Sequence, residues 1–323
     1  MKSSVGPIVA AAAAFMTFAS PSHATLTLTP GGIALGFSIS TVVAPVPGGT
    51  GVGVLGSTVN PAGQIIFNSS ADGTNYRFAN ADNQTLANAI SSTPEQGFPE
   101  ALVTANGSVW SGGGVLHRLN SDGSLAQAFS TIPATYGMWT DPVNQHIIAS
   151  TGGSIIDIDV SNVNAPTYRI ITNQFTDGLT VSPDGTVAYL NTNAYNISDG
   201  SLFASYSVSG ADGMGVIVSS NSLNGDVVVS TDGLGTLVLL EPGNNFAQTL
   251  IATGGGYGDF ANTDPTTGTL LFGSGGSLLR LSCGTGCGVG SVSPPPTDIP
   301  EPASLAVLAI GAAGVSQVRR RRA

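Results

Sequence analysis

Short apolar stretches recur along the chain, and each is bounded by a turn rich in Gly, Asn, Asp or Pro. In the clearest example, a short strand ends at Ser182 and the turn Pro183–Gly185 leads into the β-rich segment Thr186–Thr192. Proline presets the first dihedral of such a turn, aspartate caps the turn through its side chain, and glycine takes the position with positive φ. The pattern therefore predicts strand–turn–strand units rather than helices.

These turns repeat at intervals of about 41 residues. Each anchor residue is followed by a strand, a Gly- or Asn-rich turn, a third strand and an outer strand such as Leu125–Phe129 or Thr167–Ile171. Four short strands in about 40 residues match the size of one β-propeller blade. The six anchors are Gly63, Gly107, Gln145, Gly185, Gly225 and Gly268.

The repeat predicts an all-β fold, a β-propeller of six blades. Seven blades remain an alternative if Thr25–Val43 contributes more than one strand. The last unit lacks a fourth strand after Leu281, so Gly36–Val43 is predicted to close the ring. A right-handed β-helix or stacked β-solenoid is the competing architecture, but its rungs are shorter, roughly 20 to 25 residues.

The segment Ser182–Asn193 resembles the YVTN-type bacterial propellers, in which a Ser-Pro-Asp-Gly turn precedes a strand. This unit matches the pattern closely, the other units keep only part of the turn, and the WD dipeptide of another propeller family is absent. The resemblance implies the propeller fold. It does not select a function, because one fold hosts many functions.

The N-terminus has the three parts of a secretory signal peptide. Lys2 supplies a positive charge, Ile8–Phe18 is apolar apart from Thr17, and Ser22–Ala24 offers small residues at the cleavage site. The apolar run is too short to span a membrane, which needs roughly 20 residues. We expect signal peptidase to release a mature chain that begins at Thr25.

The C-terminus carries a second targeting signal. Pro300, Glu301 and Pro302 interrupt regular structure, because neither proline donates a backbone hydrogen bond, and the apolar run Ala303–Val315 follows. Behind it stands a stop-transfer cluster of Arg319, Arg320, Arg321 and Arg322. This arrangement resembles the PEP-CTERM sorting signal. The resemblance implies processing by an exosortase after export across the inner membrane of a Gram-negative bacterium. The short hydrophobic helix would anchor the protein transiently before it reaches the cell surface or the extracellular space.

The chain thus divides into four predicted parts. They are a signal peptide (1–24), a propeller body (25–290), a Pro-rich linker (291–299) and the sorting segment with its hydrophobic run and Arg cluster (300–323).

Charge is sparse and acidic. Between Thr25 and Thr297 the chain has 17 acidic residues, four basic residues and no lysine. Nucleic acid is therefore not an expected partner, because phosphate binding needs clustered Lys or Arg. The two cysteines, Cys283 and Cys287, are predicted to form a local disulfide in an exported protein. A zinc site is disfavoured, because two thiols without nearby histidines do not complete one.

Candidates for catalysis are few. After signal removal the histidines are His117 and His146, both interpreted as residues on the surface of strands, and no G-x-S-x-G motif is present. Asp177, Asp212 and Asp259 each precede the first strand of successive units, so a ring would bring them near one mouth of the channel. They are candidate ligands for Ca²⁺, the one cofactor considered. The alternative is that they are structural caps.

The leading hypothesis is an exported binding or structural module, rather than an enzyme, at the cell surface or in the extracellular matrix. Its expected partners are an exopolysaccharide or a surface protein. The alternative is a propeller-class hydrolase or lactonase with a metal site at the channel mouth. Ice binding ranks below both, because the body has no regular Thr-x-Thr ladder beyond Thr25–Thr29.

Overall fold

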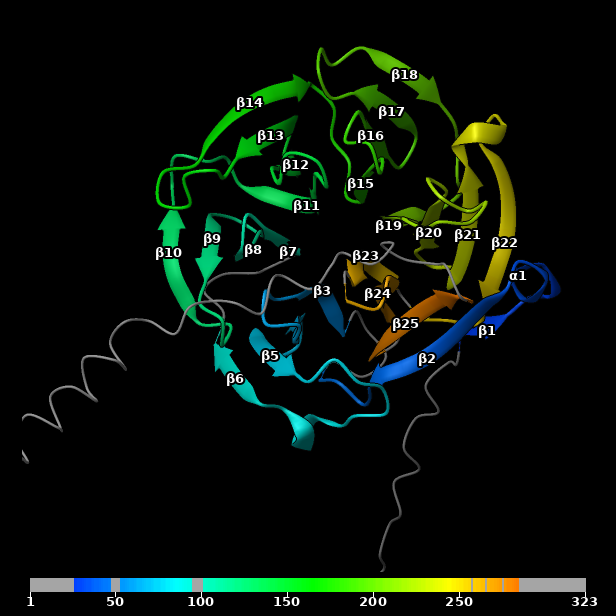
Figure 1. The fold of residues 1–323 in the computed structure, drawn as a ribbon, viewed down its shortest axis with the longest axis horizontal. Helices are drawn as coiled ribbons and strands as arrows, with labels where there is room; N and C mark the ends of the chain where they lie inside the picture. Colours follow the sequence, from blue (N-terminus) through cyan, green and yellow to red (C-terminus); the bar gives the residue numbers. More distant parts are fainter. Residues whose placement is uncertain are drawn as a thin grey trace, which may run out of the picture.

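The computed structural model describes residues 26–47, 53–94, 101–256, 258–264, 266–274 and 276–284. These residues form six antiparallel sheets of four or five strands, which stand around one central axis (Figure 1). In four of the sheets the strand nearest the axis comes first along the chain, and in the other two an N-terminal strand is added on the outside. This arrangement is a β-propeller, and the prediction of an all-β fold with six blades is confirmed.

Four blades consist of four consecutive strands each. Blade 1 contains β3 (Val54–Val59), β4 (Ile65–Ser69), β5 (Thr74–Phe78) and β6 (Ser91–Pro94). Blade 2 contains β7 (Leu102–Ala105), β8 (Ser108–Ser111), β9 (Leu116–Leu119) and β10 (Leu125–Phe129). Blade 3 contains β11 (Thr135–Thr140), β12 (Ile147–Thr151), β13 (Ile155–Asp159) and β14 (Thr167–Thr172). Blade 4 contains β15 (Leu179–Val181), β16 (Val187–Leu190), β17 (Asn193–Asn196) and β18 (Leu202–Ser205).

The N-terminal segment completes the last two blades. Blade 5 contains β19 (Ala211–Val216), β20 (Val227–Thr231), β21 (Thr236–Glu241) and β22 (Ala247–Thr253), with β1 (Thr27–Leu28) as a fifth strand. Blade 6 contains β23 (Gly258–Asp264), β24 (Thr269–Ser274) and β25 (Ser277–Cys283), with β2 (Phe37–Val43) as its outer strand. β2 pairs antiparallel with β25, from Phe37 opposite Cys283 to Val43 opposite Leu278. The predicted closing strand is thus confirmed.

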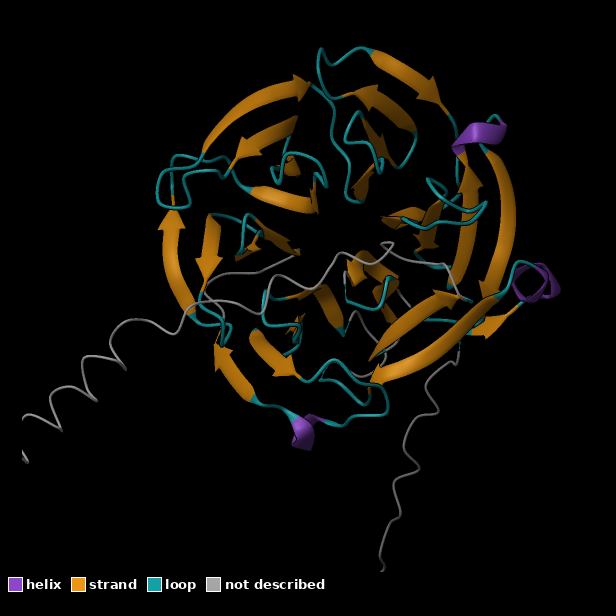
Figure 2. Cartoon of the chain, in the orientation of Figure 1, coloured by secondary structure: helices purple, strands orange, loops and turns teal. Residues whose placement is uncertain are grey.

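The helical segments are short and lie on the outside of the ring (Figure 2). Within the described residues they are α1 (Pro30–Ala34) and the 3-10 turns η1 (Leu86–Asn88) and η2 (Pro242–Asn244). In α1 the Thr29 hydroxyl caps the first turn by accepting from the Gly32 N–H at 3.1 Å. A Cβ at Gly32 would lie 2.2 Å from the Ile251 carbonyl oxygen, so glycine lets α1 rest against β22. No helix in the described part of the chain is long and apolar enough to cross a membrane.

The turn that joins the first and second strands of each blade follows the predicted repeat. All six anchors have positive φ, from 58° at Gln145 to 89° at Gly225. Aspartates cap several of these turns: Asp141 accepts from the Val143 N–H at 2.8 Å and Asp264 from the Thr266 N–H at 2.9 Å. These six turns lie at the same end of the channel, here named the turn face. The connections between blades lie at the opposite face.

Burial follows position within the blade. The second strands of blades 1, 3, 4, 5 and 6 are buried along their whole length, because the neighbouring blades cover both faces of each sheet. The outermost strands β14 and β18 are mostly exposed. The core therefore consists of layers between blades, and these interfaces, rather than single sheets, bury the apolar side chains.

A buried ion-pair network ties the last blade to the first. Arg280 on β25 is 6% exposed; its Nε donates to Asp82 at 2.9 Å and its Nη1 to the buried Asp264 at 2.6 Å. Asp82 belongs to the connection between β5 and β6 of blade 1, so the network reinforces the seam where β2 closes the ring.

Candidate functional site

The mouth of the central channel at the turn face is mostly apolar. A cavity of about 350 Å³ lies there between the inner strands, with Trp139, Val59 and Val216 among its lining residues. Threonine hydroxyls around it are already engaged: Thr104 donates to the Val59 carbonyl at 2.8 Å and Thr140 to the Thr104 carbonyl at 3.0 Å. None of the described lining residues is ionisable. This mouth does not offer the converging acid and base groups that catalysis of hydrolysis needs.

Three carboxyl groups meet at the opposite face, between blades 4 and 5. Asp177 precedes β15, Asp212 lies in β19, and Asp232 lies in the turn between β20 and β21. Burial, the charges of Asp232 and Asp177, and hydrogen bonds with both raise the pKa of Asp212 to about 8. Burial also raises the pKa of Asp177 and of Asp232. The structure therefore brings two of the three predicted ligands together and adds Asp232.

The fit of this cluster to a metal ion is poor. Within the described ranges, no three His, Cys, Asp or Glu side chains are arranged to hold a metal ion. With a pKa near 8, Asp212 keeps its proton at neutral pH, and this proton relieves the repulsion between the acids. The side chain of Asp259, the third predicted ligand, lies outside the described part of the chain. Its metal role remains a prediction.

Both histidines occupy structural positions. His146 Nδ1 lies 2.9 Å from Asp157 Oδ1, and Arg169 Nη2 lies 2.8 Å from the other oxygen of Asp157. His117 lies in β9 and is buried, so its interpretation as a residue on the surface of a strand was wrong. β9 is buried at three of its four residues, and the sequence pattern does not reveal which strand positions are covered in the folded ring.

The predicted disulfide and sorting residues can be placed only in part. Cys283 ends β25 and is disulfide-bonded. Its expected partner Cys287 lies outside the described residues, so the Cys283–Cys287 pairing remains a prediction. The sorting residues Pro300, Glu301 and Pro302 and the terminal arginines also lie outside the described ranges.

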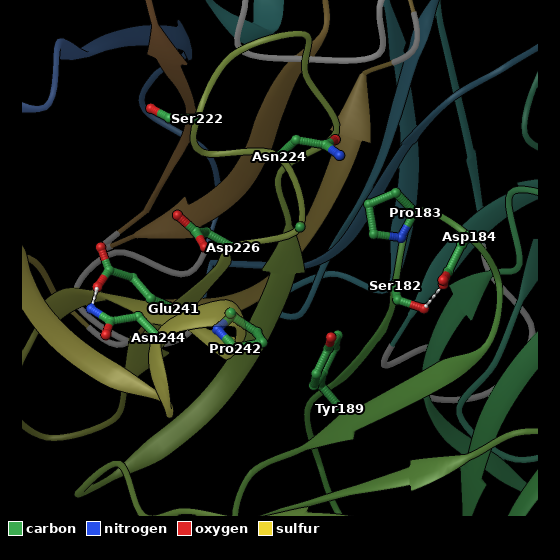
Figure 3. Close-up of a pocket in the computed structure, with 12 residues that line it drawn as sticks. Ser182, Pro183, Asp184, Tyr189, Ser222, Asn224, Asp226, Glu241, Pro242 and Asn244 are labelled. Carbon is green, nitrogen blue, oxygen red and sulfur yellow. Dashed lines mark hydrogen bonds between the residues drawn. The ribbon is translucent and has the colours of Figure 1, made fainter.

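An open polar pocket lies on the turn face between blades 4 and 5 (Figure 3). We name it the blade 4–5 pocket; its volume is about 470 Å³. Three turns supply its walls. These are the β15–β16 turn, the long β19–β20 loop and the β21–β22 turn, and their lining residues are Ser182, Pro183, Asp184, Ser222, Asn224, Gly225, Asp226, Glu241, Pro242, Gly243 and Asn244. Tyr189 on β16 completes the lining.

Local hydrogen bonds hold these walls in place. Asp184 Oδ1 accepts hydrogen bonds from the hydroxyls of Ser182 at 2.6 Å and Thr186 at 2.7 Å. These bonds, the one from Ser182 most of all, keep the pKa of Asp184 below its ordinary value. In the β19–β20 loop, Asn224 accepts from the Ser219 N–H at 2.9 Å. On the third wall, Asn244 Nδ2 donates to Glu241 Oε2 at 2.9 Å. The pocket is thus built before any ligand arrives.

Tyr189 contributes a buried ring and a polar tip. The residue is 5% exposed, and its ring meets Phe246 edge to face with 6.5 Å between centroids. Burial, and then the charges of Asp184 and Asp226, raise its pKa to about 12, so the hydroxyl keeps its proton. Figure 3 shows this hydroxyl pointing toward the space between the three walls. Among the described residues it has no hydrogen-bond partner.

Sequence reasoning missed most of this pocket. Asp184 was noticed only as a turn residue, and Tyr189, Asp226 and Glu241 were not singled out. One signal was available: the β19–β20 connection, with Asn221, Asn224 and Asp226, is longer and more polar than the other turns of this type. Loops that exceed the minimum length in a repeat protein often carry its binding residues.

Comparison with solved structures shows the fold. A gluconolactonase from Xanthomonas campestris is 12% identical, with 76% of this chain and 94% of that chain covered and a TM-score of 0.55. A luciferin-regenerating enzyme is 9% identical, with 80% and 99% covered and a TM-score of 0.57. An auxiliary nutrient binding protein from Bacteroides thetaiotaomicron is 10% identical, with 76% of each chain covered and a TM-score of 0.55. The neighbours thus include enzymes and a binding protein, and at these identities they establish the propeller class alone.

The sequence comparisons identify the tail. Residues 298–322 match the PEP-CTERM protein-sorting motif. A comparison with curated proteins finds no match. The chain is a six-bladed β-propeller. It also carries a C-terminal PEP-CTERM sorting motif. The motif implies export, transient anchoring in a membrane and processing by an exosortase.

Proposed function

We propose that this protein is a non-catalytic polysaccharide-binding module of the cell surface or extracellular matrix. The observation that carries the proposal is the blade 4–5 pocket. Its hydroxyl, carboxamide and carboxylate groups stand beside Tyr189, whose hydroxyl has no partner in the described part of the chain. Sugars present dense arrays of hydroxyl donors and acceptors, and a pre-formed polar pocket with few mobile parts suits them.

Sorting supports the proposed location. The PEP-CTERM motif implies export, which would bring the propeller into contact with polysaccharide outside the cell. The acidic body, with its four basic residues, offers little to an anionic partner such as nucleic acid. Removal of the tail would leave the propeller free to associate with the matrix through its turn face.

The test is binding of the exported, processed protein to polysaccharide purified from its host, measured by co-sedimentation. Tyr189→Phe should weaken binding roughly three- to tenfold, because a neutral hydrogen bond contributes about 0.5–1.5 kcal/mol. Tyr168→Phe makes the same chemical change on the exposed outer strand β14 and should have no effect. Equal binding by all three proteins would reject the pocket as the site, and absence of binding by the unaltered protein would reject the proposal.

A metal-dependent hydrolase or lactonase is the second candidate. The observation that favours it is a cavity of about 300 Å³ beside Asp177 and Asp212. The buried Oδ1 of Asn191, which also lines this cavity, has no partner among the described residues. Calcium titration by calorimetry tests this candidate: stoichiometric binding that is lost on Asp177→Ala with Asp212→Ala would favour the enzyme over the binding module.

A further inference from the structure

The blade 4–5 pocket concentrates negative charge. Asp184, Asp226 and Glu241 line it, and none of its described lining residues is basic. Asp184 Oδ1 already accepts hydrogen bonds from the Ser182 and Thr186 hydroxyls. The side chain of Asp226, in contrast, has no hydrogen-bond partner in the described ranges, and the charge of Glu241 acts on it. Asp226 and Glu241 therefore form a pair of like charges without a compensating cation.

A second, independent feature points to a ligand at this pair. Tyr189 is only 5% exposed, yet its hydroxyl points into the pocket and has no hydrogen-bond partner among the described residues. The hydroxyl borders the pocket rather than the core, so it can donate a hydrogen bond to a ligand there. The carboxylate pair and the phenol thus face the same space from β16, the β19–β20 loop and the end of β21.

The third wall is held in a strained conformation. Asn245 and Phe246 follow one another with φ of 50° and 57°, a region that residues other than glycine rarely adopt. The Phe246 ring is stacked on Tyr206 with 4.7 Å between centroids, and this packing fixes the turn that carries Glu241 and Asn244. Consecutive strained residues persist where the surrounding structure over-determines them, and such residues cluster at ligand sites.

We propose that the blade 4–5 pocket recognises a cationic amino sugar, with the ammonium group between Asp226 and Glu241 and a sugar hydroxyl accepting from Tyr189. This inference rests on the proposed polysaccharide-binding function and names its ligand class: a polymer that contains hexosamine with free, protonated amines. Uronic acid polymers are disfavoured, because their carboxylates would meet three acidic side chains. N-Acetylated sugars lack the charge that the pair selects.

Proton binding to the pair makes the recognition pH-dependent. Burial, and then the charge of Glu241, raise the pKa of Asp226 to about 6. The groups that face Asp226 across the pocket are Glu241 from β21, Asp184 from the β15–β16 turn and Tyr189 from β16. Below about pH 6 Asp226 gains a proton and the pair loses half of its charge, so the selectivity for amines should decline there.

The experiment is calorimetric titration of the processed protein at pH 6.5, where amino-sugar amines are partly protonated and Asp226 is still mostly ionised, and at 150 mM salt, where exposed charges are screened. The probes are oligomers of equal length: glucosamine, N-acetylglucosamine, glucose and galacturonic acid. The glucosamine oligomer should bind at least about tenfold more tightly than the N-acetylated oligomer, and this preference should shrink at pH 5. Asp226→Asn and Glu241→Gln should each abolish the preference while binding of the neutral oligomer persists. Asp199→Asn, which removes one charge from an exposed turn outside the pocket, should preserve it.

The outcomes separate this inference from the proposed function. Binding of neutral oligomer that depends on Tyr189 but shows no preference for amines would overturn the inference and leave the polysaccharide-binding function standing. A preference for amines that survives both Asp226→Asn and Glu241→Gln would also overturn it. Displacement of the glucosamine oligomer by calcium, with the same dependence on Asp226, would assign the pair to a metal ion instead. No binding of any oligomer or of host polysaccharide would reject both proposals.

Discussion

Aspartates in this protein differ in protonation because their surroundings differ. Asp184 is held ionised by hydrogen bonds from Ser182 and Thr186. Asp212 and Asp226 are driven the other way by burial and by neighbouring carboxylates. Residue type alone therefore does not identify which acids cap turns and which are functional candidates. The contacts of each carboxyl group decide, and these differ between turns of the same repeat.

Asp212→Asn should stabilise the protein at alkaline pH. The pKa of Asp212 is about 8 in the folded state against an ordinary value of 3.8, so the folded state holds a proton that the unfolded state loses. Stability is fully present below about pH 4 and falls as the pH rises toward 8. Removal of the ionisable group should raise Tm at pH 8 by several degrees, since about 1 kcal/mol corresponds to roughly 2–4 °C in a body of this size.

The check is calorimetric melting of both proteins at pH 4 and pH 8. The difference in Tm should be large at pH 8 and small at pH 4. Asp199→Asn serves as the control, because this exposed acid has its pKa lowered by hydrogen bonds from Ser201. A difference in Tm that is independent of pH would show that Asp212 is not the titrating group.

Elements repeat more faithfully than residues do. The turn after the first strand keeps its left-handed anchor in all six blades, although blade 3 carries Gln145 where the others have glycine. Blade 6 keeps four strands although its fourth comes from the N-terminus. The ring thus requires a left-handed residue at each of these turns and a strand at each position of a blade. The type of residue, and the part of the chain that supplies the strand, can vary.

Gln145→Gly should raise stability by about 0.5–1 kcal/mol. The left-handed conformation, with φ of 58°, costs an L-residue about 1–2 kcal/mol that glycine does not incur. The greater freedom of glycine in the unfolded chain offsets part of the gain. Urea unfolding measures the change. Gly185→Ala at the equivalent turn is the converse control and should destabilise, because φ is 71° and a Cβ would lie 2.6 Å from Asp141 Oδ1. Equal effects of the two substitutions would contradict the conformational explanation.

Loss of β2 should abolish cooperative folding. Val42 and Val43 are fully buried, and β2 is the hydrogen-bonding partner of β25. A chain that begins at Ala44 would expose the edge of β25 and open the ring. A chain that begins at Leu35 loses β1 and α1 but keeps β2, and it should still melt in one transition. Near-UV circular dichroism on heating distinguishes them. A cooperative transition in the shorter chain would show that ring closure does not depend on β2.

At the scale of the whole molecule, the closed propeller and the C-terminal sorting motif are separate parts of the chain. The propeller is complete within the described residues, since its last strand ends at Cys283, well before the sorting motif at 298–322. The motif delivers the body, and the body carries the pockets. Neither part determines what the other does, so delivery and binding can be tested independently.

Glu301→Ala should block processing by the exosortase. The protein should then keep its full C-terminal mass and fractionate with membranes, whereas the unaltered protein should appear outside the cell in a shorter form. Intact mass spectrometry of the membrane and extracellular fractions provides the measurement. Glu95→Ala removes a glutamate outside the motif and should leave sorting unchanged. Release of the Glu301→Ala protein in the same shortened form as the unaltered protein would contradict the role of the Pro-Glu-Pro segment.

The sequence by itself determined the features that are periodic or local. The spacing of Gly63, Gly107, Gln145 and their equivalents predicted six blades, because each turn is set by the residues within it. The missing strand after Leu281 predicted that Gly36–Val43 closes the ring, because a blade needs four strands. The sorting motif was readable for the same reason, since its three parts are contiguous.

Only the tertiary structure decided which turns of neighbouring blades face one another. Asp184, Asp226 and Glu241 come from three separate turns, and the repeat does not show that their side chains line one pocket. Arg280 reaches Asp82 across 198 positions of the chain. The partners of a surface side chain depend on how neighbouring blades twist and pack. The repeat in the sequence does not specify these contacts for individual residues. The candidate ligand site arose at that level, where side chains distant in sequence share one space.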